Sequence, residues 1–139
     1  MGVWRIRVNR LGTLMKRYIV AIAVAVGCFA LSTAPGNAQS AEAGQAVFKH
    51  DCAICHEIAP GKNKIGPSLA GIVGRTAGTV PNFHYSDANK NSGLTWDVAT
   101  LDRYLVNPRA TVVNTTMSYA GVKDEQKRRD LIAYLSTLK

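Results

Sequence analysis

The sequence is poor in the features that mark several common classes of protein. It has only three cysteines. Since Cys28 lies in a stretch that we expect to be removed, two remain, which is too few for a structural zinc site with its four ligands. There is no dense run of Lys and Arg, which argues against binding to nucleic acid. The longest apolar run, residues 18–31, has 14 residues, whereas a helix that spans a bilayer needs about 20.

The first 38 residues have the order of regions that is typical of an export signal. Five basic residues and no acidic one precede the apolar run, and small residues, among them Gly36 and Ala38, follow it. We therefore expect residues 1–38 to be a cleaved signal peptide, with a retained membrane anchor as the less favoured alternative. A start of translation at Met15 would already give a complete signal peptide, because two basic residues then lead directly into the apolar run.

Removal of this segment changes the charge of the protein. The whole chain has 17 basic and 9 acidic residues. Five of the basic residues lie in the signal, so residues 39–139 keep 12 basic and 9 acidic residues, a net charge of +3. A length of about 101 residues predicts a single domain with limited apolar surface to bury.

Three stretches of residues 39–139 are predicted to be helical. Ser40 is a candidate N-cap for a first helix, and Thr95 for a second that runs to about Asn107 before Pro108. A third helix is predicted from about residue 124 to 138. We expect loops at 57–83, which is rich in Gly and Pro, and at 109–121. No stretch alternates as a strand does, so the sequence predicts a small all-α protein with long loops.

Apolar residues at helical spacing mark the expected inner faces of the later helices. On the second helix these are Leu101, Tyr104 and Leu105. On the third they are Leu131, Ile132, Tyr134, Leu135 and Leu138, and the opposite, solvent-facing side is expected to carry Lys127, Arg128 and Arg129.

The strongest local pattern is Cys52-Ala53-Ile54-Cys55-His56, which has the C-x-x-C-H form of c-type haem attachment. Two thiols three residues apart can add to two vinyl groups of one porphyrin, and neutral imidazole is a good ligand for iron. A thioredoxin-like dithiol is disfavoured because no strand precedes Cys52, and a disulfide leaves the adjoining His unexplained. The sequence predicts one covalent haem c, held by Cys52 and Cys55 and ligated by His56.

A second axial ligand is predicted by elimination. Met1 and Met15 lie in the signal, so Met117 is the only methionine of residues 39–139. A lone Met is often core filler, but Met117 stands between Thr116 and Ser118 rather than on an apolar stripe. Of the other candidates, His50 is too close to the attachment site and His84 is expected to face solvent. Met117 is therefore the predicted second ligand.

Taken in order, these residues resemble the class I cytochromes c of the mitochondrial and purple-bacterial periplasmic type. The resemblance covers nearly all of residues 41–138 and implies a small cytochrome c fold of three to five helices wrapped around one haem. Its elements are Gly44 with Phe48, the C-x-x-C-H pattern, residues 66–69, 85–91 and 93–96, Tyr104-Leu105, Asn107-Pro108, Met117, Ala120-Gly121 and residues 130–135.

The resemblance also implies roles for individual residues of the haem pocket. It implies that the carbonyl of Pro67 accepts the second ring N–H of His56, which would fix the imidazole. Tyr85 and Trp96 are similar to a pair that hydrogen-bonds a haem propionate, with Arg75 nearby. The distal surroundings of the Met117 sulfur are implied to include Tyr104, Thr115 and Asn89.

The function implied is that of a one-electron carrier rather than an enzyme. We expect a monomer in the periplasm that shuttles electrons between membrane redox complexes of the respiratory or photosynthetic chain. The donor would be of the quinol–cytochrome c reductase type, and the acceptor an oxidase or a reaction centre. A haem peroxidase, a nitrite-reducing protein and a haem sensor of gases are the alternatives, and each needs an open site where Met117 stands.

The chain departs from its relatives around the expected haem edge. Tyr119 stands where Phe is common, and the ring of lysines found in mitochondrial relatives is thinned. The basic residues that remain are Lys62, Lys64, Arg109 and Lys123, with Asp51 among them. Because exposed charges are screened over about 8 Å, we expect apolar contacts around Tyr119 and Ala120 to contribute much of the docking.

Overall fold

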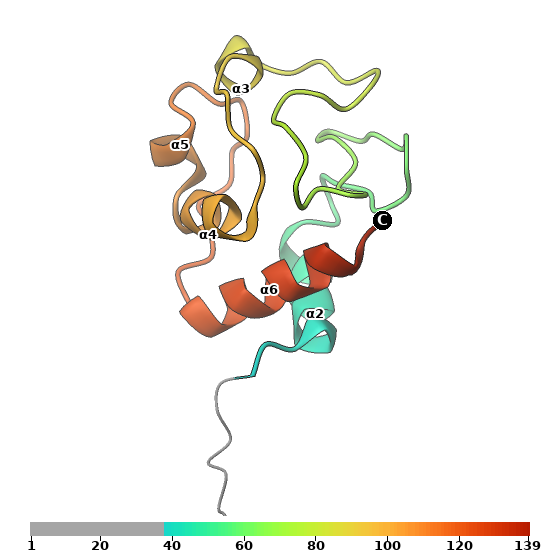
Figure 1. Cartoon of the computed structure of the whole chain (residues 1–139), viewed down its shortest axis with the longest axis vertical. Coiled ribbons are helices and arrows are strands. Elements are labelled where there is room, and N and C mark those ends of the chain that lie inside the picture. The colour runs from blue at the N-terminus through green and yellow to red at the C-terminus, as the bar shows by residue number, and fades with distance from the viewer. Residues whose placement is uncertain (1–37) are drawn as a thin grey trace, which may run out of the picture. The chain divides into compact units, whose positions relative to one another are not determined.

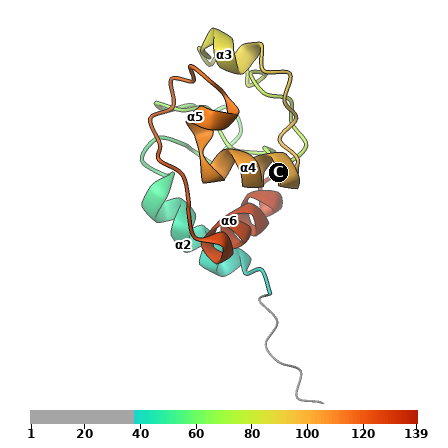
Figure 2. The same ribbon diagram turned by 90° about the vertical axis from the view of Figure 1, so that its left-hand side faces the viewer.

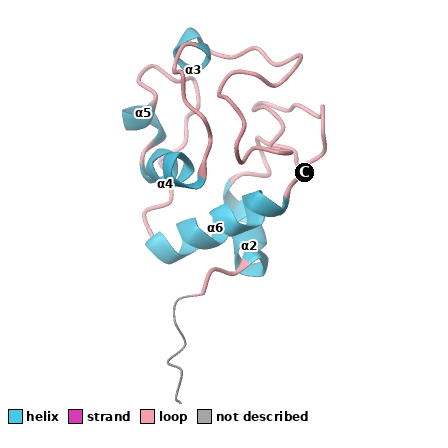
Figure 3. Ribbon diagram, viewed as in Figure 1, coloured by secondary structure: helices cyan, strands magenta, loops and turns pink. Residues whose placement is uncertain are grey.

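The structure, a computed structural model, describes residues 38–139. This part contains five helices and no strand (Figure 3), which confirms the predicted all-α class. The predicted signal peptide lies outside the described residues except for Ala38. Within residues 38–139 no helix is both long and apolar enough to cross a membrane. The helices, labelled in Figure 1, are α2 (Ala41–Asp51), α3 (Asp87–Lys90), α4 (Val98–Val106), α5 (Pro108–Thr111) and α6 (Glu125–Thr137).

Each long helix begins at a side chain that caps its first backbone N–H groups. Ser40 accepts from the N–H of Ala43 at 3.1 Å, as predicted for α2. The predicted cap of α4 was wrong. Asp97 caps the helix, accepting from Thr100 N–H at 2.7 Å, while Thr95 lies two residues earlier in an isolated bridge to Thr76.

Two four-residue helices lie in stretches for which no helix was predicted. Asn107 does not simply end α4, because its side chain accepts from Ala110 N–H at 3.2 Å and begins α5, with Pro108 in the first turn. Proline suits that position, since its fixed φ is helical and its missing N–H needs no partner. In the same way Ser86 caps α3. A helix of four residues is too short to show a helical period in the sequence.

The helices α2 and α6 cross in close contact, as both Figure 1 and Figure 2 show. Gly44 lies at the crossing, where a Cβ atom would come within 1.9 Å of the carbonyl oxygen of Asp130. One turn further along α2, the ring of Phe48 packs on that of Tyr134 with centroids 5.6 Å apart. Leu131 of α6 is fully buried beside them. The absence of a side chain at Gly44 therefore sets the distance between the two helices.

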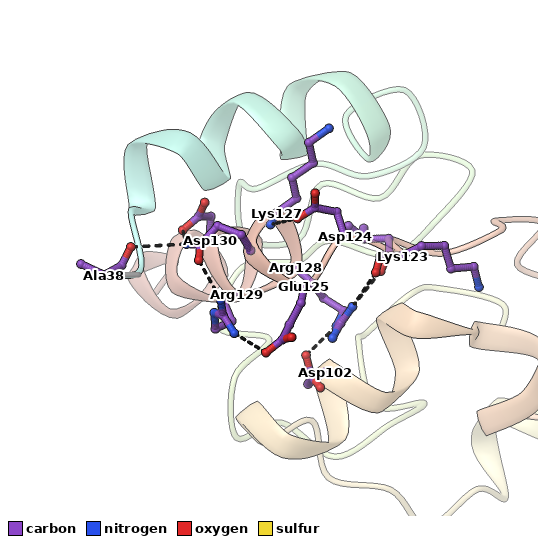
Figure 4. Close-up of polar contacts among 11 residues, drawn as sticks. Ala38, Asp102, Lys123, Asp124, Glu125, Lys127, Arg128, Arg129 and Asp130 are labelled. Carbon is purple, nitrogen blue, oxygen red and sulfur yellow. Dashed lines mark hydrogen bonds and ion pairs between the residues drawn. The ribbon is translucent and has the colours of Figure 1, made fainter. Parts of the chain in front are cut away.

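The prediction that Arg128 lies on the solvent-facing side of α6 was wrong, because this residue is only 7% exposed. Its Nε donates to Asp102 of α4 at 2.6 Å (Figure 4), and its Nη1 donates to the carbonyl of Val122 at 3.1 Å. A buried guanidinium needs such partners, since an unpaired charge is costly to bury. The helical period indicated which face Arg128 occupies, but not that α4 and the preceding loop would cover it.

We expect Gly44→Ala to destabilise the protein by at least about 2 kcal/mol, because the added methyl group has no room beside the backbone of α6. The sign of the change in stability is decisive, because at an open helix position alanine would stabilise the helix by about 1 kcal/mol relative to glycine. Denaturant unfolding of the haem-loaded protein, followed by circular dichroism, measures the change. The control is Ala46→Gly at an exposed position of the same helix, which should lose only about 1 kcal/mol. A stabilising Gly44→Ala would show that the crossing can widen without cost.

Candidate functional site

The C-x-x-C-H pattern lies on the turn that follows α2. The N–H groups of Cys52 and Ala53 both donate to Phe48 O at 2.9 Å, which ends the helix. The next turn is closed by Cys55 N–H and His56 N–H, which donate to Cys52 O at 3.0 and 2.9 Å. Both thiols are free and partly buried. One tight turn thus presents the two thiols and the imidazole together.

The imidazole of His56 is held in one orientation and one tautomer. Its Nδ1 lies 2.8 Å from the carbonyl oxygen of Pro67, and because a carbonyl only accepts, Nδ1 carries the proton. Burial lowers the pKa of His56, which favours the neutral ring with Nε2 as its electron-pair donor. A Cβ on Gly66 would lie 2.3 Å from the ring. The backbone directly before Pro67 therefore packs on the imidazole.

Met117 lies in an irregular segment that we call the Met117 loop (residues 112–124), between α5 and α6. Its sulfur accepts a hydrogen bond from the hydroxyl of Tyr104 at 3.0 Å. Its N–H donates to Thr115 Oγ1 at 3.3 Å. Tyr104 comes from α4 and is itself held against Trp96, with ring centroids 4.7 Å apart. The sulfur is therefore positioned by the buried face of α4 and not only by its own loop.

A single apolar cavity of about 340 Å³ brings these groups together. Its volume lies within the usual range for bound small molecules and cofactors. In Figure 1 the segment that carries His56 and the Met117 loop lie on opposite sides of the fold. All nine residues predicted for the site line this cavity, whereas His50 and His84 do not. The nine are Cys52, Cys55, His56, Pro67, Tyr85, Trp96, Tyr104, Thr115 and Met117.

One part of the cavity wall is polar. The hydroxyl of Tyr85 accepts from Val80 N–H at 3.3 Å. Nearby, Arg75 donates to the carbonyls of Ala70 at 2.6 Å and Ser68 at 3.0 Å. Burial lowers the pKa of Arg75 and raises that of Tyr85. This wall therefore offers a hydroxyl group and a partly desolvated positive charge to an anionic group.

The mouth of the cavity contains an unexpected contact between distant residues. The hydroxyl of Tyr119 donates to Asp51 Oδ2 at 2.9 Å, and His50 pairs with the other oxygen of Asp51. The hydrogen bond from His50 is the main cause of the lowered pKa of Asp51. Burial, with a smaller effect from Asp51 and Cys55, raises the pKa of Cys52 to about 12, so this thiol stays protonated at neutral pH.

Several further lining residues were not among the predicted site residues. Leu101 and Leu131 were assigned only to the core, but they serve both the core and the cavity. Phe83 lies edge-on to Tyr85 with centroids 4.7 Å apart, and only its aromatic character beside Tyr85 in the sequence could have indicated this. Asp51 and Tyr119 were each expected near the haem edge, but no local pattern indicated their contact, because they are 68 residues apart.

Comparison with known proteins places the chain in a family. A family model described as cytochrome c matches residues 41–139. The chain is 54% identical over 107 residues to cytochrome c2 of Blastochloris viridis, covering 76% of this chain and 84% of that protein. It is 50% identical to cytochrome c2 of Rhodoplanes tepidamans, covering 70% and 92%, and 44% identical to cytochrome c of Euglena viridis, covering 71% and 97%. The chain therefore belongs to the cytochrome c family, as a class I electron-transfer protein that carries one covalent haem c and is not an enzyme.

Proposed function

We propose that Cys52 and Cys55 attach the haem and that His56 and Met117 are the two axial ligands of its iron. The observation that carries the proposal is that His56 and Met117 line one apolar cavity with their donor atoms already fixed, one by Pro67 and one by Tyr104. The residues fit the group, since two free thiols, a neutral imidazole and a thioether are the donors that covalent haem uses.

When bound, the haem supplies one-electron exchange between ferric and ferrous iron, and its potential is raised by thioether ligation. The protein residues tune this exchange. The Pro67 carbonyl makes the His56 imidazole a better electron donor through its Nδ1 proton. The Tyr104 hydroxyl withdraws electron density from the Met117 sulfur, which favours the reduced state. The apolar walls keep water from the site.

We further propose that Arg75 and Tyr85 face the haem propionates. The guanidinium partly offsets their charge, and the hydroxyl, which only accepts in its bond with Val80 N–H, keeps its own proton to donate to them. In this role the two residues lower the cost of placing anionic groups against a poorly hydrated wall. The nearby Trp96 is 6% exposed and packs on Tyr104, and thereby connects this wall to the surroundings of the sulfur.

The cellular role that we propose is electron transfer in the periplasm between membrane redox complexes. Two observations support it: the export-type sequence of residues 1–38, and close similarity to proteins named cytochrome c2. The proposed donor is of the quinol–cytochrome c reductase type, and the acceptor is an oxidase or a reaction centre. A retained anchor would place the same domain at the membrane surface, and N-terminal sequencing of the native protein distinguishes the two forms.

The exposed surface at the mouth of the cavity is more apolar than it is basic. Ile54 and Ile65 line the cavity, yet are 77% and 79% exposed. Lys64, which precedes Ile65, pairs with Glu57 at 2.7 Å and donates to the carbonyl of Ala53 at 2.9 Å. Its charge is thus largely compensated within the chain. We propose that partners dock on these isoleucines, with charge in a minor role.

Met117→Ala should leave the haem attached but open the sixth coordination position. The reduced variant should then bind carbon monoxide, and its midpoint potential should fall by at least about 59 mV, which is a tenfold change in a one-electron equilibrium. Redox titration and absorption spectra with and without carbon monoxide measure both effects. The control is Val113→Ala in the same loop, where the side chain is 67% exposed and lies outside the cavity. A variant at 117 that keeps the thioether–iron absorption band and the wild-type potential would exclude Met117 as the ligand.

Electron transfer with the native membrane complexes should depend only weakly on ionic strength, because the basic residues expected around the cavity mouth are sparse and Lys64 is already paired with Glu57. Ile65→Ser should weaken the docked complex, chiefly by faster dissociation, whereas Arg109→Glu should mainly slow association. Stopped-flow rates across a salt series measure this. Val98→Ser serves as control, since this apolar residue is 50% exposed but lies away from the cavity mouth. A rate that falls with salt as steeply as that of a lysine-ringed relative on the same partner would contradict apolar docking.

A further inference from the structure

The part of the Met117 loop that follows Met117 is held by few hydrogen bonds. Met117 N–H is bound to Thr115 Oγ1, and the next backbone hydrogen bond along the chain is from Val122 N–H to Leu105 O at 2.7 Å. Between these points, in residues 118–121, the described structure contains one hydrogen bond, from the Tyr119 hydroxyl to Asp51 Oδ2 at 2.9 Å. This bond joins the loop to the end of α2, directly before the C-x-x-C-H turn.

Asp51 lies at a position where its charge does not favour the helix. It is the last residue of α2, and a carboxylate is unfavourable at the negative end of the helix dipole. Its position is instead explained by its contacts, since one oxygen accepts from Tyr119 and the other pairs with His50. Asp51 and Tyr119 both line the mouth of the cavity.

The ring and the hydroxyl of Tyr119 make separate contacts. Its ring packs against the hydrophobic core, which a phenylalanine ring would do equally well. The hydroxyl adds nothing to that packing. What it adds is the bond to Asp51, so the pair can be tested separately from the shape of the core.

We propose that the Tyr119–Asp51 hydrogen bond is a positioning contact that holds the Met117 loop closed over the cavity. Tyr119 is two residues from Met117, so a loop held to α2 at Tyr119 keeps the sulfur directed into the cavity. Without the bond, the loop opens more often and the sulfur leaves the iron more often. The proposal rests on the assignment of Met117 as the axial ligand.

The test is a titration of the ferric, haem-loaded protein with imidazole, which competes with the thioether for iron when the loop opens. Tyr119→Phe should raise the apparent affinity for imidazole about fivefold, as expected for loss of one hydrogen bond. Asp51→Ala should act in the same direction. The double variant should match Tyr119→Phe alone, because the same bond is lost only once. The control, Glu57→Gln, removes an equal charge that pairs with Lys64, and should leave the affinity unchanged.

Three results with the variants would overturn the proposal. One is an unchanged imidazole affinity in Tyr119→Phe, and another is a double variant in which the two single effects simply multiply. The third is a fall in global stability, measured by denaturant unfolding, that fully accounts for the gain in affinity, because the bond would then stabilise the whole fold and not position the loop. A wild-type spectrum without the thioether–iron band would overturn the assignment of Met117 together with this proposal. If the wild-type protein shows the thioether–iron band but Tyr119→Phe leaves the imidazole affinity unchanged, only the positioning contact would be overturned.

Discussion

The close crossing of α2 and α6 at Gly44 is the constraint on which the rest of the site depends. It fixes the end of α2, and with it the turn that presents Cys52, Cys55 and His56. It also brings α6 near enough for Leu131 and Leu135 to line the same cavity as the imidazole. A wider crossing would move the attachment turn away from one wall of its own cavity.

The same helix α6 determines where the Met117 loop ends. Arg128 donates to the carbonyl of Val122 and to Asp102 on α4, so the end of the loop is bound to two helices at once. Tyr104 of α4 then reaches the sulfur itself. A loop without regular structure can hold a side chain in place in this way because the buried faces of α4 and α6 supply the order that its own backbone lacks.

Local patterns in the sequence predicted the cofactor and the residues that line the cavity, but not the long-range contacts. Two features could be recognised in the sequence alone. The spacing of Cys52, Cys55 and His56 is a property of one short stretch, and the single methionine at 117 follows from counting residues. Asp97 displaced Thr95 as the cap of α4, since two nearby side chains can each cap a helix and tertiary structure selects one. The burial of Arg128 and the bond between Tyr119 and Asp51 depend on segments far apart in the chain, which no local pattern records.

The size of the cavity leads us to expect that attachment of the haem and folding are coupled in this chain. Cavity costs in protein cores are about 24 cal/mol per Å³, so an apolar space of about 340 Å³ would cost about 8 kcal/mol if nothing filled it. That is as large as the whole stability of a typical domain. The residues that line it, such as Leu101, Leu131 and Trp96, are also the core of the fold. On the proposed attachment, the porphyrin would fill this space as part of the hydrophobic core, and thioether bonds to Cys52 and Cys55 would make that part of the core permanent.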